Sequence, residues 1–363
     1  MIQDLHPPGF DLPDEASVRW SSFTKFVRAP EHNWPAQILE RPIIVGKIGR
    51  TSMALIADPE AAKTVLTGSP ERFPKWKIYD RVLAGGFGTQ NLGVVEGEQH
   101  HHQRRMLAPM FRPHRQSEAA AVFRAATERA CEEWLGRGDE IRIDAGLEMG
   151  RITLASIWVS MFGDDPAANS PPSVERAARR IDAAHTHSRV EEPPECFAEL
   201  AAEARSDPHG AGVLAPNPFS RLGAPGSEDA ADSLSQAELF DNARLFLAAG
   251  SETTATALTW ALWLLGQSPE IQRRVQAELD QVFAGGPSAS ELPERCVFTR
   301  QVVSETLRLY PPSVATVRQA RSEEVLAGET VPAGCILVVS LYALHRHALL
   351  WDAPALKGRK ANG

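Results

Sequence analysis

A cluster of polar residues interrupts an otherwise apolar stretch, Leu245 to Leu265, and is the strongest candidate for chemistry. It reads Ala249-Gly250-Ser251-Glu252-Thr253-Thr254. Burying an acid is costly unless the acid is partnered, so the cluster needs a reason. Gly250 would let a ligand approach the backbone, and the Thr253 hydroxyl can bond back to the Ala249 carbonyl and open the helix locally. Such a turn could accept a small molecule and deliver protons to it. The alternative is a Ser/Thr-rich helix face that packs against another helix.

A basic stretch, Gly97-Glu-Gln-His100-His-His-Gln-Arg104-Arg105, is a second candidate. His100 and Arg104 are four residues apart and would share one helix face. An imidazole and a cation at this spacing suit an anionic group of a ligand. The three adjacent histidines do not share a face, so they make a poor metal site. The alternative is a basic, solvated turn.

A third candidate is the pair Glu305 and Arg308, which precedes Pro311-Pro312. Residues three apart share a helix face and can form a salt bridge. Such a pair is usually solvated and contributes little to stability. Its apolar neighbours, Val302, Val303, Leu307 and Leu309, also allow a partly buried pair that fixes the helix against the following strand.

These residues must be positioned by a mainly helical fold. The longest helical pattern is capped by Ser235, with Glu238 at the capping-box position, and is stopped by Gly266. Its middle is apolar nearly all round, which predicts a buried helix. The Pro-rich region from Asp164 to Ser235 is expected to be a mobile cover. Further helices are predicted over 58–66, 116–135, 144–162, 268–283 and 296–309, and strands over 51–56, 314–317 and 335–341.

The composition excludes several classes of function. The 363 residues carry 38 Lys and Arg against 46 Asp and Glu, a net charge of −8, which gives no footprint for nucleic acid. No signal peptide and no apolar run of about 18 residues is found, so we expect a soluble cytoplasmic protein without a membrane anchor. The widely spaced cysteines predict neither disulfides nor a zinc site, and each is expected to be a small buried hydrophobe: Cys131, Cys196, Cys296 and Cys335.

Taken in order, the three candidate elements strongly resemble the cytochrome P-450 family of haem-thiolate monooxygenases, in its soluble bacterial type. The resemblance covers nearly the whole chain. It continues through Leu309-Tyr-Pro-Pro312, Val317-Arg318, Val331-Pro-Ala-Gly334, Tyr342-Ala-Leu-His345-Arg-His347 and Trp351-Asp352.

The resemblance implies a mostly α (α+β) fold, a helical single domain with small β-sheets. The domain would span residues 1–353, and residues 354–363 would be a divergent, disordered tail. The implied activity is insertion of one oxygen atom from dioxygen into a small organic substrate. The implied cofactor is haem, and a separate ferredoxin or reductase would supply electrons.

The resemblance also assigns roles to individual residues. Glu252 and Thr253 would be catalytic, lying over the haem, hydrogen-bonding dioxygen and relaying protons to it. Glu305 and Arg308 would be structural. The remaining candidates would bind the cofactor: His100, Arg104, Ala249, Gly250 and Arg318. Of these, His100, Arg104 and Arg318 would bind the haem propionates.

One element of the family pattern is missing from the sequence. The family carries its iron-binding cysteine in a Phe-x-x-Gly-x-x-x-Cys-x-Gly loop downstream of the Trp351-Asp352 stretch, and no such loop follows here. We therefore expect an incomplete domain that lacks its C-terminal haem-binding part and its metal ligand. As printed, the chain should not form a stable thiolate-ligated haem complex. The alternatives are an inactive truncated or frameshifted remnant, and a helical binding module in which Glu252 and Thr253 only pack.

Overall fold

The computed structural model describes most of the chain as two compact units. Residues 1–79 and 303–363 form unit 1, and residues 80–302 form unit 2. The Pro-rich region from Asp164 lies outside the described residues up to 232, apart from Phe219, and so does the tail 354–363. The described residues are 34–48, 50–77, 87–138, 140–162, 219 and 233–351.

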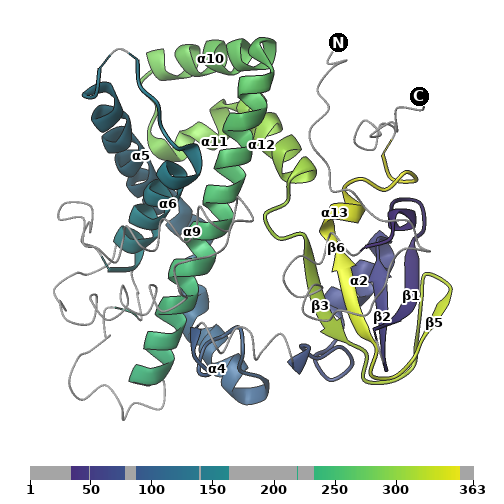
Figure 1. Ribbon diagram of the computed structural model, residues 1–363. Coiled ribbons are helices and arrows are strands. Elements are labelled where there is room, and N and C mark those ends of the chain that lie inside the picture. The colour runs from purple at the N-terminus through teal and green to yellow at the C-terminus, as the bar shows by residue number, and fades with distance from the viewer. Residues whose placement is uncertain are drawn as a thin grey trace, which may run out of the picture. The chain divides into compact units, whose positions relative to one another are not determined.

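Unit 1 is built on a mixed four-stranded sheet with the order β1-β2-β6-β3 (Figure 1). Its central pair is parallel, with Met53 opposite Ile336, and the outer pairs are antiparallel. Every residue of β6 is buried, as expected for a strand covered on both faces. The sheet therefore forms the core of the unit. The strands are β1 Ile43–Ile48, β2 Thr51–Ile56, β3 Ala315–Gln319 and β6 Ile336–Ser340.

The short elements of unit 1 follow local sequence signals. Helix α2, Pro59–Thr67, begins after Asp58, whose carboxylate accepts a hydrogen bond of 2.7 Å from the Ala61 amide. Strands β4 (Glu324–Leu326) and β5 (Glu329–Val331) form a hairpin whose two-residue turn has positive φ at both positions, 48° and 81°. Such a turn matches the twist of paired strands. The remaining short helices are η3 Ala36–Leu39 and α13 Leu341–Leu344.

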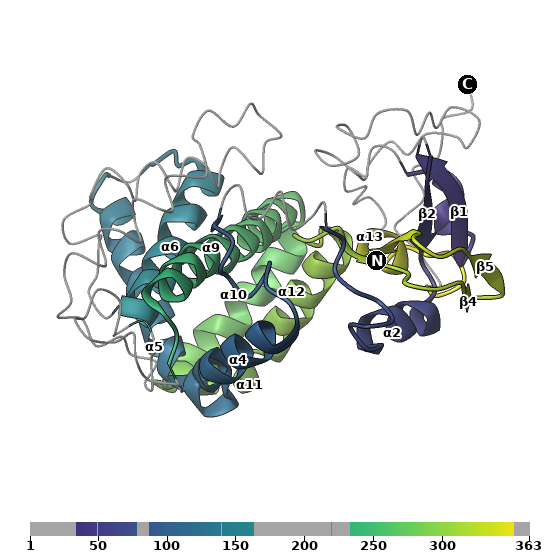
Figure 2. The same cartoon turned by 90° about the horizontal axis from the view of Figure 1, so that it is seen from below.

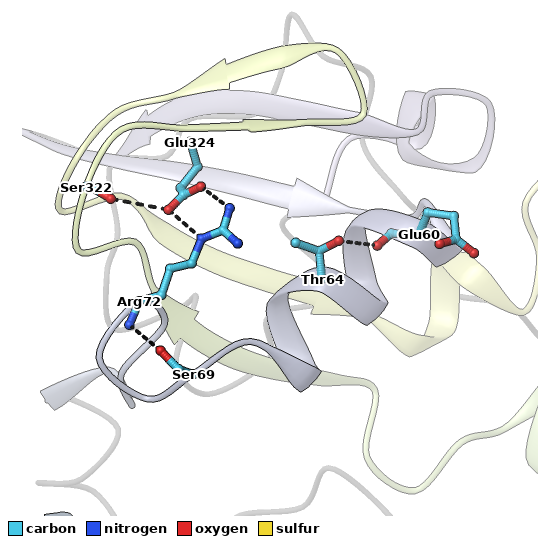
Figure 3. A network of polar contacts seen from close by, with 6 residues as sticks. All are labelled: Glu60, Thr64, Ser69, Arg72, Ser322 and Glu324. Atoms are coloured by element: carbon cyan, nitrogen blue, oxygen red, sulfur yellow. Dashed lines mark hydrogen bonds and ion pairs between the residues drawn. The ribbon is translucent and has the colours of Figure 1, made fainter.

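An ion pair between Arg72 and Glu324 connects the segment after α2 to β4 (Figure 3). The Arg72 guanidinium donates to both carboxylate oxygens of Glu324, at 2.9 and 2.5 Å. Ser322 donates a further bond of 3.2 Å to the same carboxylate, which is 8% exposed. A main-chain hydrogen bond adds to these side-chain bonds: the Arg321 amide donates to the Arg72 carbonyl. The segment is thus held at the end of the sheet.

Unit 2 is helical, and α6 and α9 lie at its centre (Figures 1 and 2). Buried side chains of α6, such as Leu154 and Trp158, belong to one apolar cluster with Leu239 and Leu247 of α9. The helices are α4 Gly97–Leu107, η4 Ala108–Phe111, α5 Pro113–Leu135, α6 Ala145–Phe162, α9 Gln236–Gln267, α10 Pro269–Ala284, η7 Ala289–Glu291, α11 Leu292–Arg295 and α12 Val297–Leu309, which includes residues of both units.

Two expectations for α9 need correction. The helix does not stop at Gly266 but continues to Gln267, because Pro269 is what disfavours a helical conformation at the preceding residue. Its apolar middle is only half buried: no side chain from 256 to 265 is buried, and Trp263 is 37% exposed. An all-round apolar helix is buried only where neighbours cover every side. The described residues leave this half of α9 partly uncovered.

Candidate functional site

The polar cluster of α9 divides into a packed side and an open side. Ser251 is fully buried and donates to the Leu247 carbonyl. Glu252 is half-buried, whereas Thr253 and Thr254 are exposed. A helix face that merely packs against another helix would not leave Thr253 exposed. The packing alternative therefore fits Ser251 better than it fits Thr253.

The Thr253 hydroxyl makes the predicted bond back to its own helix. Its Oγ1 donates to the Ala249 carbonyl at 2.9 Å, and Thr254 makes the same bond to the Gly250 carbonyl at 3.1 Å. The helix is nevertheless continuous from Gln236 to Gln267, so the expected local opening is absent. A hydroxyl can share a carbonyl that already accepts the helical amide bond, which leaves the turn intact. No hydrogen bond from another described residue reaches Thr253 Oγ1, so within the described part of the chain its lone pairs can accept one.

Gly250 allows α9 to pack closely against α6. A Cβ atom added at Gly250 would lie 3.1 Å from two side-chain carbons of Ile157. This separation is tighter than an ordinary van der Waals contact. The glycine thus has a packing role in the structure, and its role beside a ligand stays a prediction.

Helix α4 presents His100 and Arg104 beside a buried face. His100 is half-buried, with its ring 5.9 Å from that of His101. Arg104 is exposed. Leu107 and, unexpectedly, Gln103 are buried on the adjacent face. A solvated basic turn would not bury a glutamine. The burial of Gln103 could not be read from the sequence, because glutamine is a polar residue.

Arg318 lies on β3 in unit 1. It is half-buried, and its Nη1 donates to the carbonyl of Val317 at 2.9 Å. Guanidinium groups carry five donors, so this bond leaves others for an anionic ligand. Its role toward a cofactor stays a prediction.

Glu305 and Arg308 form the expected pair, but the two side chains differ in burial. Arg308 donates to both carboxylate oxygens of Glu305, at 2.7 and 2.6 Å, in the geometry that suits planar groups. The Arg308 side chain is 12% exposed and that of Glu305 is 54% exposed. Arg308 also donates to the His345 carbonyl at 2.9 Å and lies 5.0 Å from the centre of the Trp351 ring. The pair is therefore anchored on the arginine side.

Arg346 was not foreseen in this part of the site. Arg346 is 4% exposed, and its guanidinium donates to the carbonyls of Arg308 and Leu309 in the last turn of α12. Its guanidinium also lies 4.0 Å from the centre of the Tyr342 ring. Burial, together with the positive charges of Arg346 and Arg308, lowers the pKa of His345, which keeps that imidazole neutral. The sequence feature that could have indicated the buried role of Arg346 is an arginine within the apolar run before Trp351.

Burial disfavours the thiolate form of the two buried cysteines that the structure describes, Cys296 and Cys335. Burial raises the pKa of Cys335 to about 11, and burial followed by the charge of Glu278 also raises the pKa of Cys296. Cys131 is exposed on α5, so its predicted burial is wrong: it lies on a polar helix face. Within the described ranges, no group of three or more His, Cys, Asp or Glu side chains could hold a metal ion. Among the described residues, the cations His100, Arg104 and Arg318 suit the carboxylates of a haem, whereas no described cluster suits its iron.

Comparisons with known proteins agree on one family. A family model described as cytochrome P450 matches residues 37–191 and 221–355. The chain is 31% identical over 336 residues to the cyclooctat-9-en-7-ol 5-monooxygenase of Streptomyces melanosporofaciens, covering 85% of this chain and 70% of that protein. It is 26% identical to the pentalenene oxygenase of Streptomyces avermitilis, covering 90% and 75%.

A solved structure supports the same fold. A zebra fish cytochrome P450 in a structure with abiraterone has a TM-score of 0.68 and 21% identity, covering 86% of this chain and 77% of that one. The mostly α prediction with small sheets is confirmed. The predicted domain limits, 1–353, stay a prediction. Of the helices that the structure describes, none has the length and apolar character needed to span a membrane.

Proposed function

The chain belongs to the cytochrome P450 family, and on that premise we propose that it acts as a haem-dependent monooxygenase on a small organic substrate. The reaction inserts one oxygen atom from dioxygen, and a separate ferredoxin or reductase supplies the electrons. The names of the two Streptomyces relatives, a monooxygenase and an oxygenase, support this reaction class.

One observation carries the proposal: an exposed hydroxyl stands beside a half-buried acid on an apolar helix. Haem, when bound, supplies the iron at which dioxygen is activated. Thr253 Oγ1 accepts a hydrogen bond through its lone pairs, while its own hydroxyl group donates to the Ala249 carbonyl. The Glu252 carboxylate exchanges protons with solvent at the edge of the site. The two residues together hold and move a proton at Thr253 Oγ1.

The cationic side chains hold the cofactor in this proposal. In unit 2, Arg104 and His100 of α4 would bind haem propionates. The same role is carried over to Arg318 of unit 1 from the family resemblance. The exposed Arg104 guanidinium supports this role, since a charged donor binds a carboxylate more strongly than a neutral one. Ala249 and Gly250 line the helix turn beside the cofactor. Glu305 and Arg308 stabilise the fold.

The experiment uses a fused chain in which residues 1–351 are joined to the C-terminal residues of the S. melanosporofaciens relative that follow its matched region. Loaded with hemin and supplied with NADPH, ferredoxin and ferredoxin reductase, the fused chain should consume dioxygen. A control in which the grafted loop cysteine is alanine should consume much less. Uptake by the fused chain no faster than that of free hemin would contradict the proposal.

A further inference from the structure

A buried polar network in unit 2 joins α4 and the loop before it to the first turns of α9. Its central amides, Gln103 of α4 and Asn242 of α9, are both 0% exposed. Glu238, one turn before Asn242, is 9% exposed. Buried amides and carboxylates are kept in a fold only where hydrogen bonds satisfy them. The network therefore fixes the geometry of the elements that supply its partners.

Gln103 is bonded at both ends of its amide. Its Oε1 accepts a bond of 3.0 Å from Asn242 Nδ2. Its Nε2 donates to the Gln90 carbonyl at 2.7 Å and to Glu238 Oε1 at 3.1 Å. A single side chain thus connects α4 to α9 and to the preceding loop.

Asn242 completes the connection from the side of α9. Its Oδ1 accepts a bond of 2.9 Å from the Leu92 amide, and its Nδ2 also donates to the Glu238 carbonyl at 2.8 Å. Both amide groups therefore have a fixed orientation, because exchanging oxygen and nitrogen would lose every bond. The loop cannot shift along α9 without breaking them.

Hydrogen bonds within the loop from Phe87 to Gly93, and from the loop to α9, fix the conformation of the loop beside α9. Asn91, also 0% exposed, donates to the Gly88 carbonyl at 2.7 Å and accepts from the Gly93 amide at 2.9 Å. The Asp241 carboxylate accepts a bond of 2.9 Å from the Gln90 amide. Gly88 has a φ of 81°, and an added Cβ would meet that carboxylate at 2.2 Å. Only glycine allows this approach.

Glu238 is the charged member of the network. Burial would raise its pKa, but hydrogen bonds from Gln99, Ser235 and Gln103 outweigh burial and lower the pKa overall. Its second oxygen accepts from the Ser235 amide at 2.9 Å at the start of α9. The carboxylate thus joins the helix cap to the amide of Gln103.

We infer that Gln103, Asn242 and Glu238 form a positioning network that fixes α4 and the loop 87–93 on α9, and thereby sets the direction of His100 and Arg104. The part concerning the cofactor rests on the proposed function. Each residue of an α-helix is turned by about 100° from the one before it. Anchoring Gln103 therefore fixes the rotation of Arg104, which follows it, and of His100, one turn earlier.

The first test is amide hydrogen exchange on the full chain. Gln103→Met keeps the length of the side chain and removes its three hydrogen bonds. Amides of 88–107 should then exchange about tenfold or more faster, while α5 and α6 stay protected. Gln99→Met is the matched control, because Gln99 donates to the same Glu238 oxygen at 3.1 Å and to Gln90 Oε1 at 2.7 Å but is exposed, so water can replace its bonds. The control should change exchange only slightly.

Two results would overturn the positioning role. One is unchanged exchange of 88–107 in Gln103→Met. The other is an equal loss of protection over α5 and α6, since the network would then be a general core contact. Asn242→Ala provides a second variant, should Gln103→Met fold poorly, and is expected to free the same loop through loss of the Leu92 bond.

The second test is titration of hemin into the same proteins, followed by quenching of tryptophan fluorescence. Gln103→Met should weaken the apparent affinity by about tenfold, as Arg104→Ala should, although the buried Gln103 amide is bonded to Glu238 and Asn242 of α9. Equal affinity of Gln103→Met and the parent would overturn the role in cofactor binding. If the parent itself bound no hemin, that role would fall with the proposed function, and the exchange result would still decide the positioning role.

Discussion

At the residue scale, Arg308 and Glu305 share one ion pair but contribute unequally. Arg308 is mostly buried and also donates to the His345 carbonyl, whereas Glu305 is 54% exposed. Arg308→Ala should lower the free energy of unfolding by about 1.5–3 kcal/mol, because a charged donor and the partner of a carbonyl are lost. Glu305→Ala should lower it by about 0–1 kcal/mol, as for an exposed pair.

Urea denaturation of both variants checks this order. The sequence alone treated the two residues alike, because their spacing shows a shared helix face and not which partner is buried. Equal losses of stability, or a larger loss for Glu305→Ala, would show that the buried bonds of Arg308 do not decide its contribution.

Thr253 provides a second prediction at this scale. In the fused chain loaded with hemin, Thr253→Ala should raise the share of NADPH electrons released as hydrogen peroxide, because the proton held at Oγ1 is lost. Thr254→Ala is the matched control, since Thr254 is exposed and makes the same bond to the residue four before it. Peroxide and product are measured per NADPH oxidised. Coupling in Thr253→Ala equal to that in the control would assign Thr253 a structural role only.

At the element scale, local signals in the sequence predicted most of the long helices and the strands β2, β3 and β6. Helix starts could be predicted because each depends on residues within one turn. Examples are the capping box of Ser235 and Glu238, the Asp58 cap of α2, and the prolines in the first turns of α2 and α10. The pairing of β2 with β6 brings together residues from opposite ends of the chain, and no local pattern contains it. Strands β1, β4 and β5 were missed because they are short or lie at an edge.

The Arg72 and Glu324 pair gives a pH prediction at this scale. The bonds from Arg72 lower the pKa of Glu324 in the folded state, below the usual value of about 4.3. Their contribution to stability is complete above that value and is lost as the pH falls through the folded pKa. The melting temperature of the parent should therefore fall more between about pH 5 and pH 3 than that of Glu324→Gln.

Glu323→Gln is the control for this prediction, because Glu323 is the exposed neighbour of buried Glu324. It should follow the parent at every pH. Parallel melting curves for the parent and Glu324→Gln across this range would show that Arg72 does not stabilise the ionised carboxylate.

At the scale of the whole molecule, the order of motifs in the sequence identified the family. The network around Gln103 could not be predicted from the sequence. Short motifs keep their order along the chain and could be recognised without coordinates. The contacts of Gln103 with Asn242 and Gln90 join three separate segments, and glutamine has no pattern that predicts burial. The exposed position of Thr253 could not be predicted either, because it depends on which neighbours cover α9.

The most direct test of the account is the spectrum of reduced protein with carbon monoxide. The central claim is the proposed function of a haem monooxygenase, in which none of the described cysteines ligates the iron. The fused chain should show the strongly red-shifted Soret band of a thiolate-ligated haem, and the chain as printed should not. The absence of this band in the fused chain would contradict the claimed function. Cys196 lies outside the described residues, so the band in an otherwise unchanged chain carrying Cys196→Ala would contradict the assignment of Cys131, Cys296 and Cys335 as non-ligands.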